Sequence, residues 1–296
     1  MIRRDYDLVL YGASGFTGRQ AAAYLARHAS ALRWAMAGRD RGKLDAAREA
    51  AGAKADILVA EAADHRALGD LAARARVVIS TAGPFALHGG ALVEACVAHR
   101  THYADITGET PWVRDLIERH HARATAGGTR LIPCCGFDSV PSDLGAWLVM
   151  RHLRERHGTG CVEVKAYYRM RGGFNGGTLA SALNLQDSGQ AARFRDPFLL
   201  SPGRHSRREI ERNRDPEWIS YDEAIGAWVG PYFMGPINTR VVRRSAALYK
   251  DWGERYGEDF AYQEYLRYDR GPAGWLLAAA ATGAAGLFQS ALASPA

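Results

Sequence analysis

The stretch YGASGFTGRQ occupies residues 11–20 of this chain. It places Gly12, Gly15 and Gly18 at intervals of three, directly after the apolar run DYDLVL. At such a junction the first glycine permits a tight turn, the second lets a pyrophosphate approach the backbone, and the third lets a helix lie close to a strand. The following helix would offer unpaired N–H groups to the anion. The stretch therefore predicts a phosphate cradle for a dinucleotide, with a plain glycine-rich turn as the alternative.

Apolar runs and helical patterns alternate through the first half of the chain. Strands are expected at residues 5–12, 32–38, 55–60, 76–83, 101–108 and 129–136. Helices are expected between and after them, with Asp40, Asp64 and Ser142 as N-caps and with Thr110-Pro111 opening one helix as its cap and first-turn proline. Six short strands separated by helices predict an α/β fold, a Rossmann-type doubly wound parallel sheet over residues 1–158.

The pattern changes after His157-Gly158. Residues 161–172 alternate in the manner of an antiparallel strand with one solvated face, and a helix is expected at residues 178–185. Residues 193–220 are rich in arginine and lack a clear period, which indicates a solvated loop, and residues 234–252 resemble a turn leading into a helix. Residues 159–296 are therefore expected to form a second, α+β domain for substrate binding or dimerisation, and a homodimer is one hypothesis.

The end of the second predicted strand indicates which dinucleotide binds. An NAD site would have an acidic residue there for the ribose 2′-hydroxyl, whereas this chain has Gly38 followed by Arg39. Arg39 can pair with a 2′-phosphate, and Lys43 is close by in the sequence. A charge-assisted contact of about 1.5–3 kcal/mol would favour NADP about ten- to a hundredfold. The sequence thus favours NADP(H), with a solvated arginine at a helix start as the alternative.

Two further strand ends are expected to complete the cofactor site. Asp64 follows the third strand and could reach the adenine, although capping of its own helix explains it at least as well. Residues Ala82, Gly83, Pro84 and Phe85 leave the fourth strand where the nicotinamide half of the cofactor should lie.

Composition excludes several other classes of protein. The net charge of +6 over 296 residues suits an anionic small molecule but is too diffuse for nucleic acid. The ten histidines show no zinc-site spacing and the four cysteines form no C-x-x-C motif, so we expect no metal and a cytoplasmic protein with free thiols. Residues 271–296 carry no charged side chain and are mostly Ala and Gly, which predicts a buried or surface-lying helix, with peripheral membrane or lipid contact as the alternative.

Several motifs together resemble the saccharopine dehydrogenase-like oxidoreductases. They are GASGFTGR (12–19), AGRDRGKL (37–44), ISTAGPFALHGGALVEAC (79–96), HYADITGE (102–109) and CCGFDSVPSDLG (134–145). Within that family the chain is most similar to the trans-acting enoyl reductase branch of bacterial lipid assembly, and PINTRVVRRSAAL (236–248) is similar to a segment of that branch's second domain. The resemblance implies an NADP-dependent oxidoreductase that reduces an enoyl or keto group of a lipid-type acyl substrate, either a small molecule or carrier-bound.

The resemblance and the strand-end argument together give a set of cofactor-binding candidates. These are Gly12, Ala13, Ser14, Gly15, Phe16, Thr17, Gly18, Arg39, Lys43, Asp64, Ala82, Gly83, Pro84 and Phe85. The chain also departs from the family pattern twice. His88 stands where this branch is expected to have a tyrosine, and relatives are expected to extend beyond residue 296, which would leave the second domain of this chain truncated.

Catalysis needs a proton donor in addition to the cofactor. Reduction of an enoyl thioester requires a hydride at the β-carbon, donors for the enolate oxygen and a proton at the α-carbon. Candidate residues are His88, Tyr103 and Ser139, and His88 is the first choice because an imidazole titrates near neutrality. Tyr103 could equally be a core residue and Ser139 a turn residue. A saccharopine-type amino-acid dehydrogenase and a non-catalytic NADP-binding protein on lipid surfaces remain alternatives.

Overall fold

The structure is a computed structural model that describes residues 4–170, 193 and 195–293, with the side chains of the last helix described as far as residue 283. The helix predicted at residues 178–185 lies outside the described residues, as does the end of the strand predicted at 161–172. The chain divides into two compact units, Met1–Gly136 and Phe137–Ala296.

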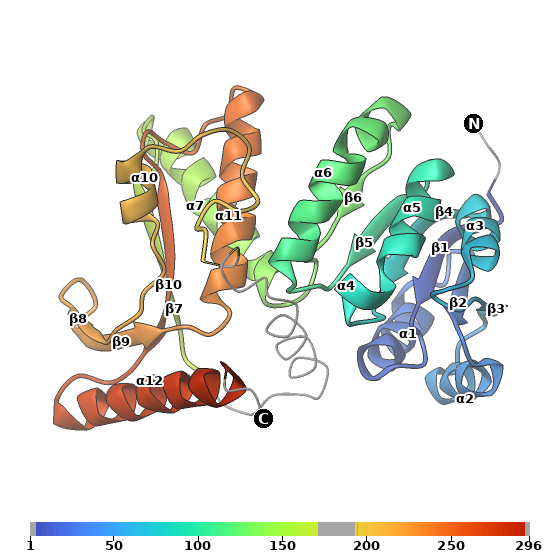
Figure 1. The fold of residues 1–296 in the computed structure, drawn as a ribbon, viewed down its shortest axis with the longest axis horizontal. Helices are drawn as coiled ribbons and strands as arrows, with labels where there is room; N and C mark the ends of the chain where they lie inside the picture. The colour runs from blue at the N-terminus through green and yellow to red at the C-terminus, as the bar shows by residue number, and fades with distance from the viewer. Residues whose placement is uncertain (1–3, 171–192, 194, 294–296) are drawn as a thin grey trace. The chain divides into compact units, whose positions relative to one another are not determined.

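A parallel six-stranded sheet forms the centre of the first unit, in the order β3-β2-β1-β4-β5-β6 (Figure 1). Its strands are β1 (Tyr6–Tyr11), β2 (Trp34–Gly38), β3 (Asp56–Val59), β4 (Ala75–Ser80), β5 (His102–Asp105) and β6 (Leu131–Ile132). This is the strand order of the Rossmann fold, in which ligands bind beyond the carboxyl ends of the strands where the order reverses, here between β1 and β4. The predicted doubly wound sheet is confirmed.

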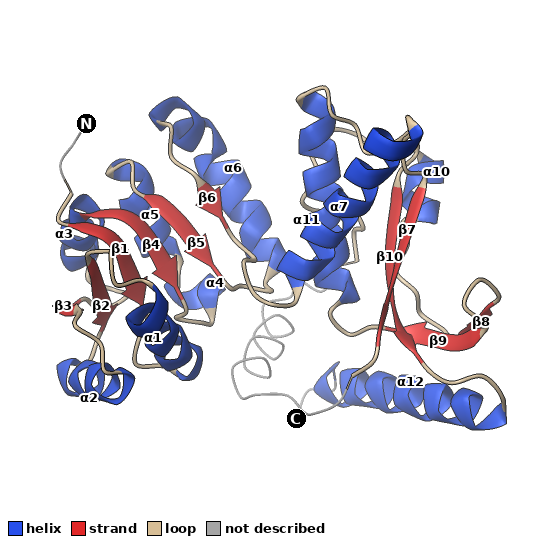
Figure 2. Cartoon of the chain, turned by 180° about the vertical axis from the view of Figure 1, so that it is seen from behind, coloured by secondary structure: helices blue, strands red, loops and turns tan. Residues whose placement is uncertain are grey.

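Helices alternate with these strands (Figure 2). They are α1 (Phe16–His28), α2 (Arg41–Ala51), α3 (His65–Arg74), α4 (Phe85–His88), α5 (Gly90–Ala98) and α6 (Thr110–Gly127). Asp40 caps α2 by accepting the Lys43 N–H at 3.0 Å, as predicted. The start of α6 differs from the prediction, because Glu109 rather than Thr110 is its N-cap residue and makes no side-chain cap bond there.

The core of the first unit explains why its strands read as continuous apolar runs. The side chains of Leu10 and Met36, on β1 and β2, are fully buried against Ala22 of α1 and Leu44 of α2. Strands of a parallel sheet that is covered on both faces carry apolar residues at successive positions rather than at alternate ones. The carboxyl ends of these strands are thereby held rigidly at one edge of the sheet.

The second unit contains a four-stranded mixed sheet in the order β7-β10-β9-β8. The strands are β7 (Glu163–Tyr168), β8 (Ser220–Asp222), β9 (Ala227–Pro231) and β10 (Ala261–Arg267). β10 pairs antiparallel with β9, and β9 with β8, but β7 pairs with β10 in parallel. The prediction of an antiparallel strand at residues 161–172 is therefore wrong. Alternation reports that one face of a strand is solvated, and it carries no information about the direction of the partner strand.

The described helices of the second unit are α7 (Ser139–His157), α10 (Arg207–Arg212), α11 (Gly235–Asp251) and α12 (Pro272–Ala293). α7 begins at Ser139, so Ser142 does not cap it but lies inside its first turn and donates to the Asp138 carbonyl at 3.1 Å. Ala146 and Met150 of α7 pack with Val242 of α11. This packing places α7 in the second unit, so the boundary between the units precedes the domain boundary predicted at residues 158/159.

Candidate cofactor site

Close packing requires glycine at two positions of the loop between β1 and α1. Gly12 has a φ of +80°, and a Cβ there would lie 2.9 Å from the Ala82 nitrogen. A Cβ at Gly18 would lie 2.2 Å from the Gly12 carbonyl oxygen. The first glycine therefore lets the loop approach the segment after β4, and the second lets α1 approach the loop. Side chains at either position would fill the cradle.

The start of α1 presents an open, positively polarised helix end. Its N-cap residue, Gly15, has extended backbone and makes no side-chain cap bond, and the first turn contains no acidic residue. Ser14 is half-buried, whereas Phe16 and Thr17 are exposed beside it. A helix end with free N–H groups and no competing carboxylate fits the diphosphate of a dinucleotide.

Arg39 follows directly after β2 and its side chain is exposed. In the described part of the chain its guanidinium forms no hydrogen bond or ion pair. Burial raises the pKa of the Tyr11 phenol at the end of β1, the Glu61 carboxylate adds to this, and the positive charge of Arg39 opposes it. Arg39 thus stands near the ends of β1 and β2 with its donors available, which fits the predicted contact with a 2′-phosphate.

Two other adenosine-side candidates already have partners. The Lys43 ammonium lies 3.8 Å from a carboxylate oxygen of Asp40. The Asp64 carboxylate accepts the Ala67 N–H at 2.9 Å and so caps α3. The structure thus shows the capping role that the sequence offered for Asp64, and contact of either residue with the cofactor stays a prediction.

The segment after β4 is tied to the glycine-rich loop. The Thr81 hydroxyl donates to the Tyr11 carbonyl at 3.1 Å or the Gly12 carbonyl at 3.2 Å, and the Thr81 N–H donates to the Tyr11 carbonyl at 2.9 Å. Of the residues predicted to border the nicotinamide, Gly83 is exposed, and Ala82 and Pro84 are half-buried. These three residues can face a ligand.

Phe85 is the fourth residue predicted to border the nicotinamide. Its ring is buried and packs against Trp112, with the ring centroids 5.8 Å apart. A Cβ at Gly83 would lie 3.3 Å from the Phe85 ring. The buried Phe85 ring therefore anchors the segment to Trp112, and contact of Phe85 with the cofactor stays a prediction.

Glu109 holds the same segment through its backbone. The two oxygens of the Glu109 carboxylate accept the N–H groups of Phe85 and Ala86, at 2.8 and 2.9 Å. Glu109 is only 4% exposed. Its contact with α4 was missed, because no local pattern connects residues so far apart along the chain.

Asp105, at the end of β5, is a fully buried carboxyl group. Its Oδ1 accepts the N–H groups of Thr107 at 3.0 Å and Cys134 at 3.1 Å, while Oδ2 has no hydrogen-bond partner among the described residues. Burial raises the pKa of Asp105 to about 6, although the two N–H groups and the nearby Tyr103 hydroxyl favour its charged form. That hydroxyl is close enough to affect the pKa but makes no hydrogen bond of normal geometry. Asp105 links the turns after β5 and β6.

The three candidate proton donors occupy different environments. His88 is exposed at the end of α4. Tyr103 is only 1% exposed and lies in the core of the first unit. Ser139 belongs to the second unit, where it is buried and its hydroxyl donates to Asn238 Oδ1 at 2.9 Å. These positions favour the structural interpretations of Tyr103 and Ser139, and a catalytic role for any of the three stays a prediction.

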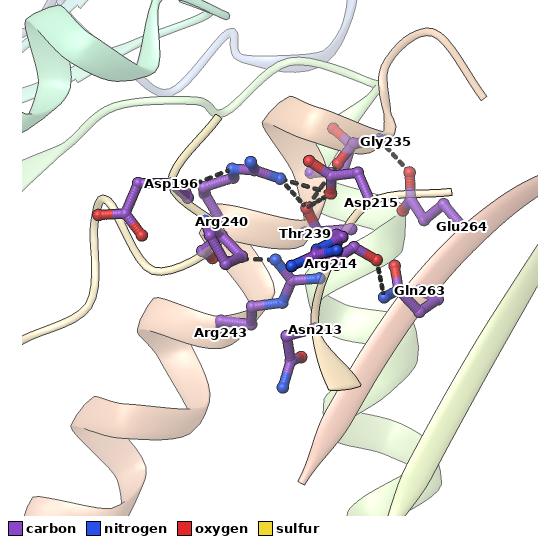
Figure 3. A network of polar contacts seen from close by, with 12 residues as sticks. Asp196, Asn213, Arg214, Asp215, Gly235, Thr239, Arg240, Arg243, Gln263 and Glu264 are labelled. Carbon is purple, nitrogen blue, oxygen red and sulfur yellow. Dashed lines mark hydrogen bonds and ion pairs between the residues drawn. The ribbon is translucent and has the colours of Figure 1, made fainter. Parts of the chain in front are cut away.

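The arginines of the segment PINTRVVRRSAAL lie within the second unit and bind its own backbone (Figure 3). Arg240 is fully buried and donates to the Asp215 carboxylate at 2.6 Å and to the Asp196 carbonyl at 3.1 Å. Arg243 is also buried and donates to the Pro197 carbonyl at 2.9 Å. Burial lowers the pKa of Arg243 to about 9. These side chains fasten the arginine-rich stretch after residue 193 to α11.

Comparison with known proteins agrees with this geometry. Residues 8–132 match the family model described as "Saccharopine dehydrogenase NADP binding domain". These residues cover nearly all of the first unit, which is therefore an NADP-binding domain. The predicted cofactor, NADP(H), is confirmed.

Curated relatives match over most of the chain. It is 41% identical over 278 residues to a "Putative trans-acting enoyl reductase" of Mycobacterium tuberculosis, which covers 89% of this chain and 65% of the relative. It is 37% identical over 295 residues to a "Trans-acting enoyl reductase" of Mycobacterium bovis, which covers 95% of this chain and 70% of the relative. The chain thus spans about two thirds of the length of these relatives.

Solved structures resemble the chain more weakly. Apo saccharopine dehydrogenase (L-Glu forming) from Saccharomyces cerevisiae shares 20% sequence identity at a TM-score of 0.46, covering 55% of this chain and 34% of that one. The assignment of the chain depends on the sequence matches and not on this likeness.

Proposed function

Because this chain belongs to the trans-acting enoyl reductase family, we propose that it reduces an enoyl or keto group of a lipid-type acyl substrate with NADPH. The observation that carries the proposal is the open anion cradle between β1 and α1, in a domain that matches an NADP-binding family. A saccharopine-type amino-acid dehydrogenase is less well supported, since the two relatives described above, which match over 89% and 95% of this chain, are both named enoyl reductases.

The backbone of the glycine-rich loop would hold the diphosphate of the cofactor. Gly12 and Gly18 keep the loop free of side chains that would fill it, and the N–H groups at the start of α1 would bind the anion. Arg39 would bind the 2′-phosphate, and Ala82, Gly83 and Pro84 would border the nicotinamide. The reactive end of the cofactor would then lie beyond the carboxyl ends of β1 and β4, where Rossmann folds bind their ligands.

When bound, NADPH supplies the hydride that reduces the β-carbon of an enoyl thioester. The protein must then stabilise the enolate oxygen and return a proton to the α-carbon. Among the three predicted donors, His88 has the exposed side chain and stays the first candidate for the proton transfer. The acyl group would be presented as a small thioester or on a carrier protein.

The helix α12 supports a peripheral contact with lipid. In the described part of the chain no helix is both long and apolar enough to cross a membrane. Leu276 and Leu277 are nevertheless 60% and 61% exposed on a helix without charged residues, whereas Gly274 and Ala278 form its buried side. We infer a cytoplasmic protein whose α12 rests on a lipid surface. A homodimer stays a hypothesis.

Turnover of the purified chain tests the proposed activity. NADPH oxidation would be followed with a panel of enoyl and 3-ketoacyl thioesters, and the acyl product of an assay with deuterated NADPH would be analysed by mass spectrometry. We expect one deuterium at the β-carbon of the product. Saccharopine with NADP⁺ serves as the competing substrate. Oxidation of saccharopine, or NADPH that binds and is never oxidised with any acyl substrate, would refute the proposal.

A further inference from the structure

The segment after β4 is held in place by contacts with residues that are distant in the sequence. Residues from the start of α6 contact it twice. The Trp112 ring packs against Phe85, and a Cβ at Gly89 would lie only 2.7 Å from that indole. Glu109 binds the backbone of the same segment. Residues at the start of α6 therefore help to hold Phe85 and Ala86 in place after β4.

Both oxygens of the Glu109 carboxylate take part in this contact. One oxygen accepts the Phe85 N–H at 2.8 Å and the other accepts the Ala86 N–H at 2.9 Å, both at the first turn of α4. A carboxylate is well suited to the positive end of a helix, and a charge-assisted hydrogen bond is about twice as strong as a neutral one. Because Glu109 is buried, water cannot replace it without a change in the packing around it.

Glu109 is itself held from the end of β5. Its N–H donates to the Thr107 hydroxyl at 3.0 Å, and the Thr107 N–H donates to Asp105 Oδ1 at 3.0 Å. Asp105 is the last residue of β5, which pairs with β4 in the sheet. An unbroken series of buried hydrogen bonds therefore runs from β5 through Thr107 and Glu109 to the backbone of Phe85.

We propose that Glu109 is a positioning residue that fixes Gly83 and Pro84 for the nicotinamide half of the cofactor. The inference rests on the proposed function, in which these residues border the nicotinamide. Glu109 is not a catalytic residue in this account, since both of its oxygens face the protein backbone. Its loss should affect the diphosphate cradle and Arg39 much less, because Thr81 joins the segment to Tyr11 and Gly12 through hydrogen bonds that do not involve Glu109.

Binding measurements separate this role from a purely structural one. NADPH and 2′-phospho-ADP-ribose, which keeps the diphosphate and the 2′-phosphate but lacks the nicotinamide, would be titrated into the full chain carrying Glu109→Gln. The amide accepts at one position and presents N–H groups at the other, so one backbone N–H loses its partner. We expect the Kd of NADPH to rise about tenfold while the Kd of 2′-phospho-ADP-ribose changes less than about twofold. Glu49→Gln, on the exposed face of α2, is the matched control and should leave both Kd values unchanged.

A second pair of variants keeps the test available if Glu109→Gln fails to fold. Thr107→Val removes the acceptor of the Glu109 N–H and should weaken NADPH binding in the same selective way, whereas Thr107→Ser retains the hydroxyl and should restore it. Equal losses for both ligands, or no loss for NADPH, would overturn the proposal. The readout is binding, so a chain that binds NADPH but reduces no acyl substrate would refute the proposed function and leave this test intact.

Discussion

Gly18 lies so close to the Gly12 carbonyl oxygen that a Cβ at position 18 would stand 2.2 Å from it. The same Cβ would also lie 2.8 Å from the Ala13 Cα, so both of the atoms that it would meet belong to the backbone. The loop can therefore relieve the clash only by moving away from α1. That movement would displace the N–H groups that are proposed to bind the phosphates.

The first prediction concerns Gly18→Ala. We expect the Kd of NADPH to rise at least about a hundredfold and stability to fall by about 2 kcal/mol, because overpacking forces a backbone shift. Calorimetric titration and thermal unfolding would measure the two effects. Gly69→Ala in α3 is the control, since a Cβ there meets its nearest atom at an ordinary 3.6 Å. Unchanged NADPH affinity in Gly18→Ala would show that the loop does not hold the cofactor.

The second prediction concerns the choice of cofactor. Arg39→Gln should raise the Kd of NADPH about ten- to a hundredfold and leave the Kd of NADH within about twofold, because only NADPH carries the 2′-phosphate. Fluorescence titration with both nucleotides measures this ratio. Arg27→Gln, in the last turn of α1, is the control. Equal losses for the two nucleotides would remove Arg39 from the 2′-phosphate site.

The third prediction concerns pH and Asp105. Its pKa of about 6 in the folded chain lies above the ordinary 3.8, so folding favours the protonated carboxyl. The stability contributed by this group is present below about pH 4 and is lost as the pH rises through 6, by about 3 kcal/mol in total. Asp105→Asn cannot ionise and should gain stability relative to the wild type over this range.

Urea unfolding at several pH values between about 4 and 7.5 would measure the difference between the two proteins. The difference in unfolding free energy, variant minus wild type, should increase with pH. Asp70→Asn, on the exposed face of α3, provides the matched control. Parallel curves for Asp105→Asn and wild type would contradict the predicted linkage.

The fourth prediction concerns the buried ion pair of the second unit. Asp215→Ala removes the carboxylate that lies 2.6 Å from the fully buried Arg240, and we expect a loss of about 3 kcal/mol in unfolding free energy. Replacing both residues, as Arg240→Met with Asp215→Leu, should recover at least half of this loss because no unpaired charge remains. Asp259→Asn breaks only an exposed pair with Arg208 and should change stability by less than about 0.5 kcal/mol. A double variant as unstable as Asp215→Ala would count against this explanation.

The fifth prediction concerns α12. Leu276→Ser with Leu277→Ser should lower co-flotation with mixed phosphatidylcholine and phosphatidylglycerol vesicles about tenfold, because two exposed apolar side chains are lost. Leu32→Ser, an exposed leucine of the first unit, is the control and should not affect flotation. If the wild-type chain does not float with the vesicles, the lipid contact is absent.

The elements of the first unit could be predicted because their signals are local. Buried parallel strands give continuous apolar runs, and Asp40 and Asp64 mark helix starts because their carboxylates accept N–H groups in the first turns of the helices that follow them. The same local reasoning misplaced the starts of two other helices. Ser142 donates to the Asp138 carbonyl, and Glu109 is the N-cap residue of α6. The role of each residue depends on the partners that the fold places beside it.

The direction of β7 and the position of α7 depend on contacts distant in sequence. β7 pairs with β10, and α7 packs against α11, so neither relation leaves a trace in the nearby residues. The candidate site shows the same division. The glycines of the loop could be recognised from the sequence, because close packing requires them at regular spacing. The hydrogen bond between Glu109 and Phe85 could not, because it depends on β4 and β5 being neighbours in the sheet.

A crystal structure of the chain with bound NADP⁺ would be the most direct test of the proposed cofactor site. We expect the diphosphate within about 3 Å of the backbone N–H groups of Ser14, Phe16 or Thr17, with the 2′-phosphate against the Arg39 guanidinium. A diphosphate bound elsewhere, or a 2′-phosphate directed away from Arg39, would contradict it.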